Sequence, residues 1–295
     1  MINNVLSSSL SPIKAAKFID IHYHVNPDAY ERRYSALQAG RIYKQLNGAV
    51  VLKSHLGSTV KIANDAQNEG LPVYGSIVLN KIAGGIDYRY VLRELSTYNP
   101  IDNIALLVHL PTITGRTHAS KLKRTVVTNI PQDQLFAPET ISDESNKLKQ
   151  SVVDILKLSL DYPIVISSGH ANKMEVELLV EACCKLGIKK LVLNQPANPL
   201  TGMTFNDLSQ LARYDFIWFE QTALTYLLEY QSKEDFFNVI LKLPRVIYSS
   251  DLGQPSQIDI QQWHEEYTQW LTEKVISFSR LELLVKDNPE KLLMY

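Results

Sequence analysis

Short apolar runs recur at regular intervals along the chain, and segments of helical periodicity lie between them. Most of the runs are continuous stretches of Val, Ile and Leu, which is typical of strands buried on both faces of a parallel sheet. We predict eight such strands, over residues 18–24, 49–55, 73–80, 104–111, 164–170, 191–196, 216–221 and 246–251.

Between the runs, apolar residues recur at the three- and four-residue spacing of a buried helix face. Three faces stand out: Val176, Leu179, Val180 and Cys183; Leu208, Leu211 and Ala212; and Phe236, Phe237, Ile240 and Leu241. A strand and a helix repeated eight times predict an α/β fold, a single (β/α)8 TIM barrel over residues 1–295. An open doubly wound sheet is the alternative, but no Gly-x-Gly-x-x-Gly follows the first strand to favour it.

One segment, residues 112–146, lacks a clear period and contains Pro131, Pro138 and many Thr, Ser and Asp residues. Loops of this length in a compact domain usually serve a function or are disordered. The segment follows the fourth predicted strand, on the side where barrel active sites form. We interpret it as a loop insertion that forms a lid, with an excursion of no function as the alternative.

Composition excludes some classes of partner. The formal net charge is -1, so nucleic-acid binding has no electrostatic support, and the Lys121–Arg124 cluster is expected to be a solvated loop. No apolar run is long enough to predict a membrane span. The partner expected is a small-molecule substrate.

The cysteines and the first ten residues bear on the cellular compartment of the protein. Cys183 and Cys184 are adjacent in a helical pattern and have no third cysteine to pair with, which favours a reducing, cytoplasmic location. The first ten residues, rich in Ser and Asn, predict a frayed terminus rather than a signal peptide. Trp263, Tyr267 and Trp270 are expected in the core, with a contact in a homo-oligomer as the alternative.

Candidate chemistry gathers where the predicted strands end. In a barrel the carboxyl ends of the strands converge on one mouth, so side chains there share a pocket. Two residues separated by one residue on a strand point to the same side, as the imidazoles of His-x-His do. The strand-end residues are His22, His24, Lys53, His55, Asn80, His170, Gln195, Glu220 and Asp251. The direction of His109 depends on the strand register and is left open.

We predict that His22, His24, His170 and Asp251 bind a divalent metal ion. Three imidazoles and a carboxylate suit Zn²⁺, with Mn²⁺ or Fe²⁺ as alternatives. Such an ion lowers the pKa of water, and Asp251 can accept the proton as general base. The competing interpretation is a pair of hydrogen-bonded structural histidines and an aspartate that caps the next helix.

The remaining candidates concern the substrate. Lys53 and His55 are predicted to act at the site together with Asp251; Lys53 can bind a substrate carboxylate, act as a base, or be carboxylated and bridge two metals, and a structural salt bridge is the alternative. His55 is a further ligand or a substrate contact. The other expected substrate contacts are Arg32, Asn80, His118, Gln195 and Glu220.

The pattern resembles the amidohydrolase superfamily of metal-dependent barrels. That superfamily carries His-x-His after strand one, histidines after strands five and six, and an aspartate after strand eight. The chain is most similar to an uncharacterised, amidohydrolase-related group, the DUF6282 type. The residues that carry this resemblance are 20–24, 26–28, 51–55, 75–80, Gly84-Gly85, 110–112, Gly169-His170 and 250–254. The ending Asp287–Leu293 also resembles the Asn-Pro-x-x-Leu-Leu close of the superfamily.

One position departs from the superfamily. Gln195 stands where a histidine is expected after strand six, and glutamine is a weak ligand for transition metals, so a mononuclear site is favoured over a two-metal site. The resemblance implies a barrel and a metal ion, but no particular reaction for this group. Our leading hypothesis is a metal-dependent hydrolase that cleaves an amide or cyclic amide C–N bond of a small polar substrate. A non-hydrolytic decarboxylase, lyase or cyclase on the same site is the first alternative. A binding protein that has lost catalysis is the second.

Overall fold

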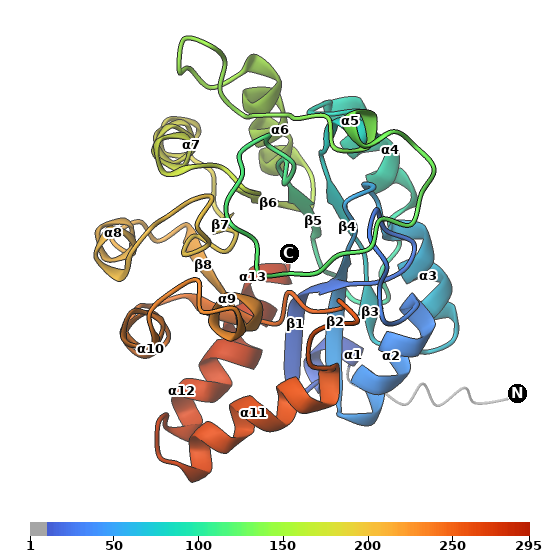
Figure 1. Cartoon of the computed structure of the whole chain (residues 1–295), viewed down its shortest axis with the longest axis vertical. Helices are drawn as coiled ribbons and strands as arrows, with labels where there is room; N and C mark the ends of the chain where they lie inside the picture. Colours follow the sequence, from blue (N-terminus) through green and yellow to red (C-terminus); the bar gives the residue numbers. More distant parts are fainter. Residues whose placement is uncertain (1–10) are drawn as a thin grey trace, which may run out of the picture.

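The computed structural model describes residues 11–295, so the prediction for the first ten residues lies outside it (Figure 1). All eight predicted strands are present, and the third is divided in two at Gly75. The strands are β1 Phe18–His24, β2 Gly48–Lys53, β3 Val73–Tyr74, β4 Ser76–Val78, β5 Leu106–His109, β6 Ile164–Ser167, β7 Leu191–Leu193, β8 Ile217–Thr222 and β9 Val246–Ser249.

The strands form a ring of parallel neighbours. Their order is β1-β2-β3 in one ladder and β4-β5-β6-β7-β8-β9 in the other. Thr59 links the two ladders, since its hydroxyl donates to the Leu52 carbonyl (3.0 Å) and accepts from the Ser76 amide (2.9 Å). At the opposite junction the Asp251 amide donates to His22 O (2.8 Å) and the His24 amide donates to Leu252 O (2.9 Å). The predicted (β/α)8 TIM barrel is confirmed.

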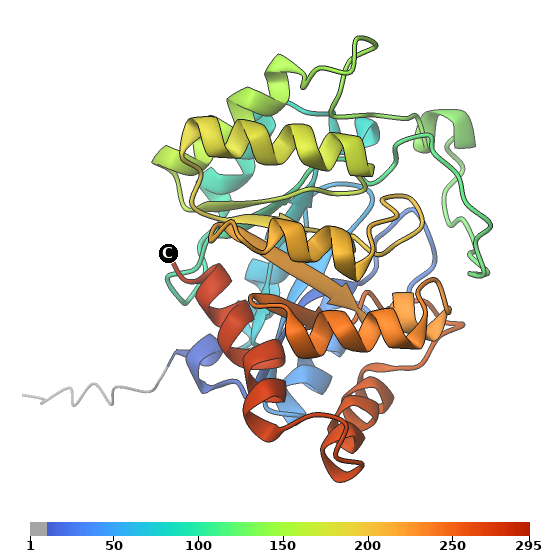
Figure 2. The same cartoon turned by 90° about the vertical axis from the view of Figure 1, so that its left-hand side faces the viewer.

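Helices surround the ring (Figures 1 and 2). One long helix follows each barrel strand: α2 Ala36–Gln45, α3 Val60–Asn68, α4 Tyr88–Thr97, α6 Gln150–Asp161, α7 Lys173–Leu186, α8 Phe205–Leu211, α10 Lys233–Lys242 and α11 Ile260–Thr272. Shorter helices are α1 Pro12–Ala15, η1 Lys81–Ala83, α5 Gln132–Leu135, α9 Ala223–Leu227, α12 Phe278–Glu282, η2 Leu283–Asp287 and α13 Asn288–Leu293. Within residues 11–295, no helix has the length and apolar character needed to cross a membrane.

The predicted helix faces largely match the buried ones. The four apolar residues named on α7 are buried, and so are Leu208 on α8 and both Phe236 and Ile240 on α10. Leu241 was wrongly placed on the buried face, because its side chain is 39% exposed. Adjacent helix residues point about 100° apart, so Phe236 and Ile240, four apart, take the core side of α10. The aromatic group of α11 is buried in the core, as predicted.

The core has two parts. The larger cluster lies between the strands and the helices. The smaller one fills the barrel, with side chains from alternating strand positions: Ile19, Ile21, Ala49, Val51, Leu107, Val165, Val192, Trp218 and Ile247. Toward the carboxyl ends of the strands, the next inward-facing positions carry polar side chains.

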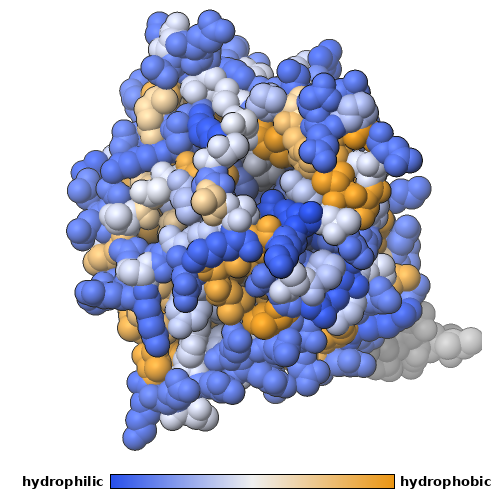
Figure 3. Space-filling model, in the orientation of Figure 1, coloured by the Kyte–Doolittle hydropathy of each residue, from blue (hydrophilic) through white to orange (hydrophobic). Residues whose placement is uncertain are grey.

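The 112–146 segment passes across the carboxyl ends of the strands (Figure 1). Its first part is held by Asn80, whose Oδ1 accepts from the amides of Thr112 (2.8 Å) and Ile113 (3.0 Å). Its middle pairs with the loop after β1, where the Glu31 amide donates to Thr125 O (2.9 Å). The face of the molecule over the strand ends is largely hydrophilic, with hydrophilic residues gathered near its centre (Figure 3).

Candidate metal centre

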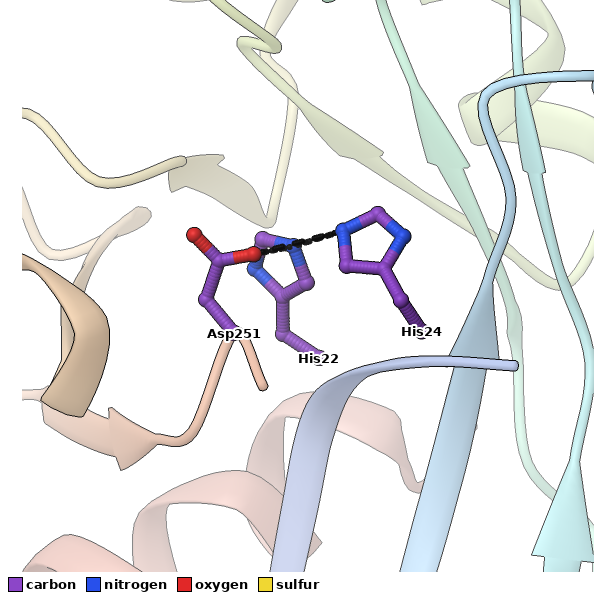
Figure 4. Close-up of side chains that lie close together, drawn as sticks. All are labelled: His22, His24 and Asp251. Atoms are coloured by element: carbon purple, nitrogen blue, oxygen red, sulfur yellow. Dashed lines mark hydrogen bonds and ion pairs between the residues drawn. The ribbon is translucent and has the colours of Figure 1, made fainter. Parts of the chain in front are cut away.

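Three ligand atoms from the two ends of the barrel sequence meet at its mouth (Figure 4). The Nε2 atoms of His22 and His24 lie 3.3 Å apart. Oδ1 of Asp251 lies 3.0 Å from Nε2 of His22 and 3.2 Å from Nε2 of His24. All three side chains are buried. The structure thus brings together three of the four residues predicted to bind metal.

Both imidazole rings are backed by carboxylates. Nδ1 of His22 lies 2.9 Å from Oε1 of Glu220, and Nδ1 of His24 lies 3.4 Å from Oδ2 of Asp28. An imidazole whose Nδ1–H faces a carboxylate presents the lone pair of Nε2, which is the usual arrangement of a metal-binding histidine. Both lone pairs then face one carboxylate oxygen. Three acceptors this close need a proton or a metal cation between them.

A bulge in β1 turns both imidazoles toward the mouth. Asp20 lies opposite Val50 on β2 while Tyr23 lies opposite Leu52, so β1 has one extra residue in this interval. Ile19 and Ile21 fill the barrel, and simple alternation would send the even-numbered histidines outward. The extra residue reverses the parity, and Tyr23 packs in the outer core instead.

Asp251 reaches the histidines through an uncommon backbone conformation. It follows β9 with a φ of 51°, in the left-handed region that few non-glycine residues adopt. Its amide is held by the His22 carbonyl at 2.8 Å. Residues held in such conformations concentrate at functional sites, where the surrounding structure over-determines them.

The electrostatics favour positive charge among the three ligands. Burial alone lowers the pKa of His22, but Asp251 and Glu220 outweigh it and raise that pKa to about 8. Burial, with Arg32 nearby, lowers the pKa of His24 to about 3, so this ring is neutral at pH 7. Burial raises the pKa of Asp251, yet the two imidazoles hold it well below its usual range.

The donor set fits a divalent cation. Two imidazole nitrogens and one carboxylate oxygen are ligands that Zn²⁺, Mn²⁺ and Fe²⁺ accept. Glu220 fixes the ring orientation of His22 through the 2.9 Å contact with Nδ1, as carboxylates behind metal-binding histidines do, while Asp28 lies 3.4 Å from Nδ1 of His24 without forming a hydrogen bond to it. These residues therefore form a candidate metal centre.

A pocket of about 390 Å³ opens above the three ligands. This is within the size range of small-molecule sites. Strand ends supply one wall and the 112–146 segment supplies much of the other. The lining includes His22, His24, Tyr30, Lys53, His55, Thr112, Arg116, His118, Leu122, Arg124, Phe136, His170, Gln195, Tyr230 and Asp251.

His170 lines this pocket but is outside the close group of ligand atoms. The reason is local: it follows Gly169 after β6, and its amide donates to Pro111 O (3.0 Å), which ties it to the loop after β5. Its Nδ1 is buried and has no hydrogen-bond partner among the described residues. Burial, with Lys53 nearby, holds the pKa of His170 well below its ordinary value, so the ring is neutral.

Lys53 and His55 both line the pocket, as the spacing predicts. Lys53 is buried, and its ammonium donates to Oδ1 of Asn194 (2.8 Å). Burial lowers the pKa of Lys53 to about 8, so the amine is mostly protonated at pH 7. The ring of His55 stacks on His24 with centroids 4.9 Å apart, and its Nδ1 lies 3.1 Å from Oδ2 of Asp28.

A polar layer lies beneath the pocket, inside the barrel. His109 pairs with Ser167 (Nδ1 to Oγ, 2.9 Å), and the hydroxyl of Ser249 donates to Glu220 (2.7 Å). The parity of the strands explains these positions, since each residue is two positions beyond an inward apolar residue. Glu220 therefore supports His22 from below and does not line the pocket where a substrate contact was expected.

Two more expected substrate contacts also lie outside the pocket lining. Arg32 is buried and pairs with Asp28, with Nη2 2.6 Å from Oδ2. The side-chain oxygen of Asn80 accepts hydrogen bonds from two backbone amides of the 112–146 segment. A buried charge or amide group needs hydrogen-bond partners. Arg32 and Asn80 find these partners within the protein and not in the pocket. His118 and Gln195 do line the pocket.

Asp28 and Arg124 were missed at the sequence level. Asp28 stands four residues after His24 and four before Arg32, a spacing that points to contact only if the loop turns as a helix does. Arg124 was assigned to a solvated loop, yet Ser120, Leu122 and Arg124 all line the pocket. Alternate residues of an extended segment share one face, and that periodicity was the available signal.

The 112–146 segment is anchored by an ion pair between Arg116, which is partly exposed, and the buried carboxylate of Glu175. Nη1 of Arg116 lies 2.8 Å from Oε2 of Glu175, at the start of α7, and the hydroxyl of Ser142 donates to Oε1 of Glu175 (2.7 Å). Burial raises the pKa of Glu175, but these hydrogen bonds outweigh it and lower the pKa below 4.5. This carboxylate therefore stabilises the segment while it is ionised.

We expect Glu175→Gln to lower the free energy of unfolding by about 1–3 kcal/mol at pH 7, because a charge-assisted pair is lost while glutamine still suits the helix-capping position. Since the folded pKa is lowered, the effect is fully present above pH 4.5 and disappears as the pH falls through the folded pKa. Urea unfolding of both proteins from pH 7 to pH 3 measures it. An undiminished difference at pH 3 would contradict this assignment.

The fold and the cluster at the mouth define a TIM-barrel protein with a candidate metal centre. The chain belongs to a family described as a family of unknown function (DUF6282), whose model matches residues 17–220. The predicted membership of the DUF6282 type is thereby confirmed. A search of curated proteins finds no match to the sequence.

Two solved structures share the fold. An uncharacterized TIM-barrel protein, Bb4693 from Bordetella bronchiseptica, has a TM-score of 0.52 at 11% identity, over 93% of this chain and 98% of that chain. The inactive dihydroorotase-like domain of the CAD-like multifunctional protein of Chaetomium thermophilum has a TM-score of 0.54 at 10% identity, over 94% and 79%. At these identities the likeness concerns the fold alone.

Proposed function

We propose that this protein is a metal-dependent hydrolase that cleaves an amide or cyclic amide C–N bond of a small polar substrate. The observation that carries the proposal is the convergence of His22, His24 and Asp251, whose ligand atoms lie 3.0–3.3 Å apart at the mouth of the barrel. In barrel enzymes the catalytic residues stand at the carboxyl ends of the strands.

His22, His24 and Asp251 would hold the ion, and His170, which lines the same pocket, would be the fourth ligand predicted from the sequence. A divalent ion bound there supplies Lewis-acid chemistry, polarising a carbonyl and making water more acidic. Asp251 is ionised and able to accept a proton from the attacking water and return it to the leaving nitrogen. Glu220 keeps the imidazole of His22 in the orientation that this requires.

The 112–146 segment is the lid of the pocket in this proposal. It contributes Arg116, His118, Leu122 and Arg124 to the lining and rests on Tyr230, whose hydroxyl accepts from the Lys121 amide (2.8 Å). A covered pocket excludes bulk water and strengthens every charge interaction within it.

Elemental analysis of the purified protein, followed by turnover in heavy-oxygen water, tests the proposal. We expect about one Zn, Mn or Fe per chain and one solvent oxygen in the product of an amide substrate. Protein that contains no such metal and takes up none in a titration would falsify the proposal.

Gln195 supports a second candidate function, in which the same pocket binds a small molecule or converts it without hydrolysis. It lines the pocket with a φ of 43° where the superfamily has a histidine. A decarboxylase, lyase or cyclase would turn over its substrate without gaining solvent oxygen. A binding protein would hold a small molecule tightly and leave it unchanged.

A further inference from the structure

The ammonium of Lys53 is a buried cation without a carboxylate partner. Its side chain lines the pocket, yet the residue is only 2% exposed. Its ammonium makes one hydrogen bond, to Oδ1 of Asn194 at 2.8 Å. Among residues 11–295 no carboxylate oxygen lies within 4.0 Å of it. An ammonium has three donors, so donors remain for a molecule in the pocket.

The other cations around the pocket divide into two groups. Arg32 and Arg116 are each paired with a buried carboxylate, at 2.6 Å from Asp28 and 2.8 Å from Glu175. Arg124 has no such partner within 4.0 Å in the described part of the chain. Its guanidinium lies over the ring of Tyr30, 5.0 Å from the centroid. Within residues 11–295, Lys53 and Arg124 are therefore the two lysine or arginine cations of the lining that have no carboxylate within 4.0 Å.

Tyr30 holds Arg124 at the rim. The ring of Tyr30 stacks on Phe136 of the 112–146 segment, with centroids 5.2 Å apart, and meets the edge of His55 at 5.5 Å. Arg124 is thus placed over the entrance by an aromatic side chain of the loop after β1. A cation at the rim and a cation below it raise the local concentration of anions in the pocket.

The charged side chains of the lining are mostly cationic. Among the described lining residues the acidic side chain is Asp251, which already faces two imidazoles. Lys53, Arg116 and Arg124 add positive charge to the same lining, and a divalent ion would add more. Glu220, Asp251 and Asp28 act on the Lys53 ammonium only from beyond 4.0 Å. A neutral or cationic substrate would therefore leave this buried cation without a direct counter-charge, which is costly.

Resting on the proposed function, we propose that the substrate carries an anionic oxygen group, a carboxylate or a phosphate, which Lys53 binds from below while Arg124 attracts it at the rim. A compact ammonium suits either group as a point charge. The substrate class is then an amide or cyclic amide of an acid, rather than a neutral amide.

Calorimetric titration of the chelator-treated full chain tests this with succinate, inorganic phosphate and the neutral analogue succinamide. We expect succinate or phosphate to bind at least about tenfold more tightly than succinamide. The tighter of the two anions tells which oxygen group the site prefers. We expect Lys53→Met to weaken anion binding about tenfold or more, and Arg124→Gln to weaken it less and to reduce its salt dependence. Lys123→Gln, on the exposed neighbour of Arg124, should leave binding unchanged.

Equal binding of succinate and succinamide would overturn the inference, as would undiminished succinate binding by Lys53→Met. If Lys53→Met does not fold, Arg124→Gln and the comparison of the two probes on the unmodified chain decide the question. Because the titration uses metal-free protein, its result does not depend on the metal. Anion binding without metal uptake would refute the proposed metal-dependent hydrolase and support the anionic substrate. Metal uptake without anion binding would refute the anionic substrate and leave the proposed hydrolase standing.

Discussion

Asp251→Asn is expected to lower metal affinity by about two orders of magnitude or more and to abolish hydrolysis. Loss of an outer-sphere partner alone costs about 10–100-fold in affinity, and Asp251 belongs to the inner group. Asparagine tolerates the φ of 51° as well as aspartate does, so the backbone is retained and only the charge is removed. Metal content after dialysis against a graded chelator measures the loss.

A second aspartate-to-asparagine substitution, away from the site, controls for any general effect of this change on the protein. Asp259 caps α11 through its side chain, 2.9 Å from the Gln262 amide, and asparagine caps a helix equally well. Asp259→Asn should therefore bind metal as the unmodified chain does. Full metal content in Asp251→Asn would mean that the carboxylate is not a ligand.

Gly253→Ala is expected to destabilise the fold by about 3 kcal/mol or more. A Cβ at this position would overlap the carbonyl oxygen of His24, and the φ of 118° is one that side chains rarely adopt. The clash falls at the junction of β1 with the end of β9, where His24 and Asp251 are placed. We therefore expect metal affinity to fall with stability, both measured on the same preparation.

Gly187→Ala is the matched control for the backbone effect. Gly187 also has a positive φ, 72°, at the end of α7, but a Cβ there would meet nothing within 4 Å. Its substitution should cost only about 1–2 kcal/mol, from backbone strain alone, and leave metal affinity unchanged. Similar losses of stability in the two variants would show that the contact with His24 is unimportant.

Much of the fold could be predicted from local pattern. Buried parallel strands require continuous apolar runs, and their alternation with amphipathic helices left few other topologies. Placement of His22, His24 and Asp251 at strand ends followed from the same repeat, because all such ends meet at one mouth. Local pattern does not predict the direction of a side chain that depends on pairing with a neighbouring strand. It also does not tell which of two adjacent apolar helix residues is buried, as the exposed Leu241 beside the buried Ile240 shows.

The site needed contacts that no local pattern encodes. The β1 bulge, which turns both histidines inward, is a mismatch between β1 and β2 and exists only once they pair. The role of Glu220 came from its position beneath His22, across 198 residues of sequence. Arg124 reached the pocket because the 112–146 segment crosses the mouth and pairs with the loop after β1.

The amino-acid sequence by itself determined which strands and helices form and which chemical groups stand at the strand ends, since burial and periodicity act over a few residues. Tertiary structure decided which of those groups face one another and which cations within residues 11–295 lack a carboxylate partner, because distance and desolvation arise only when remote segments pack together.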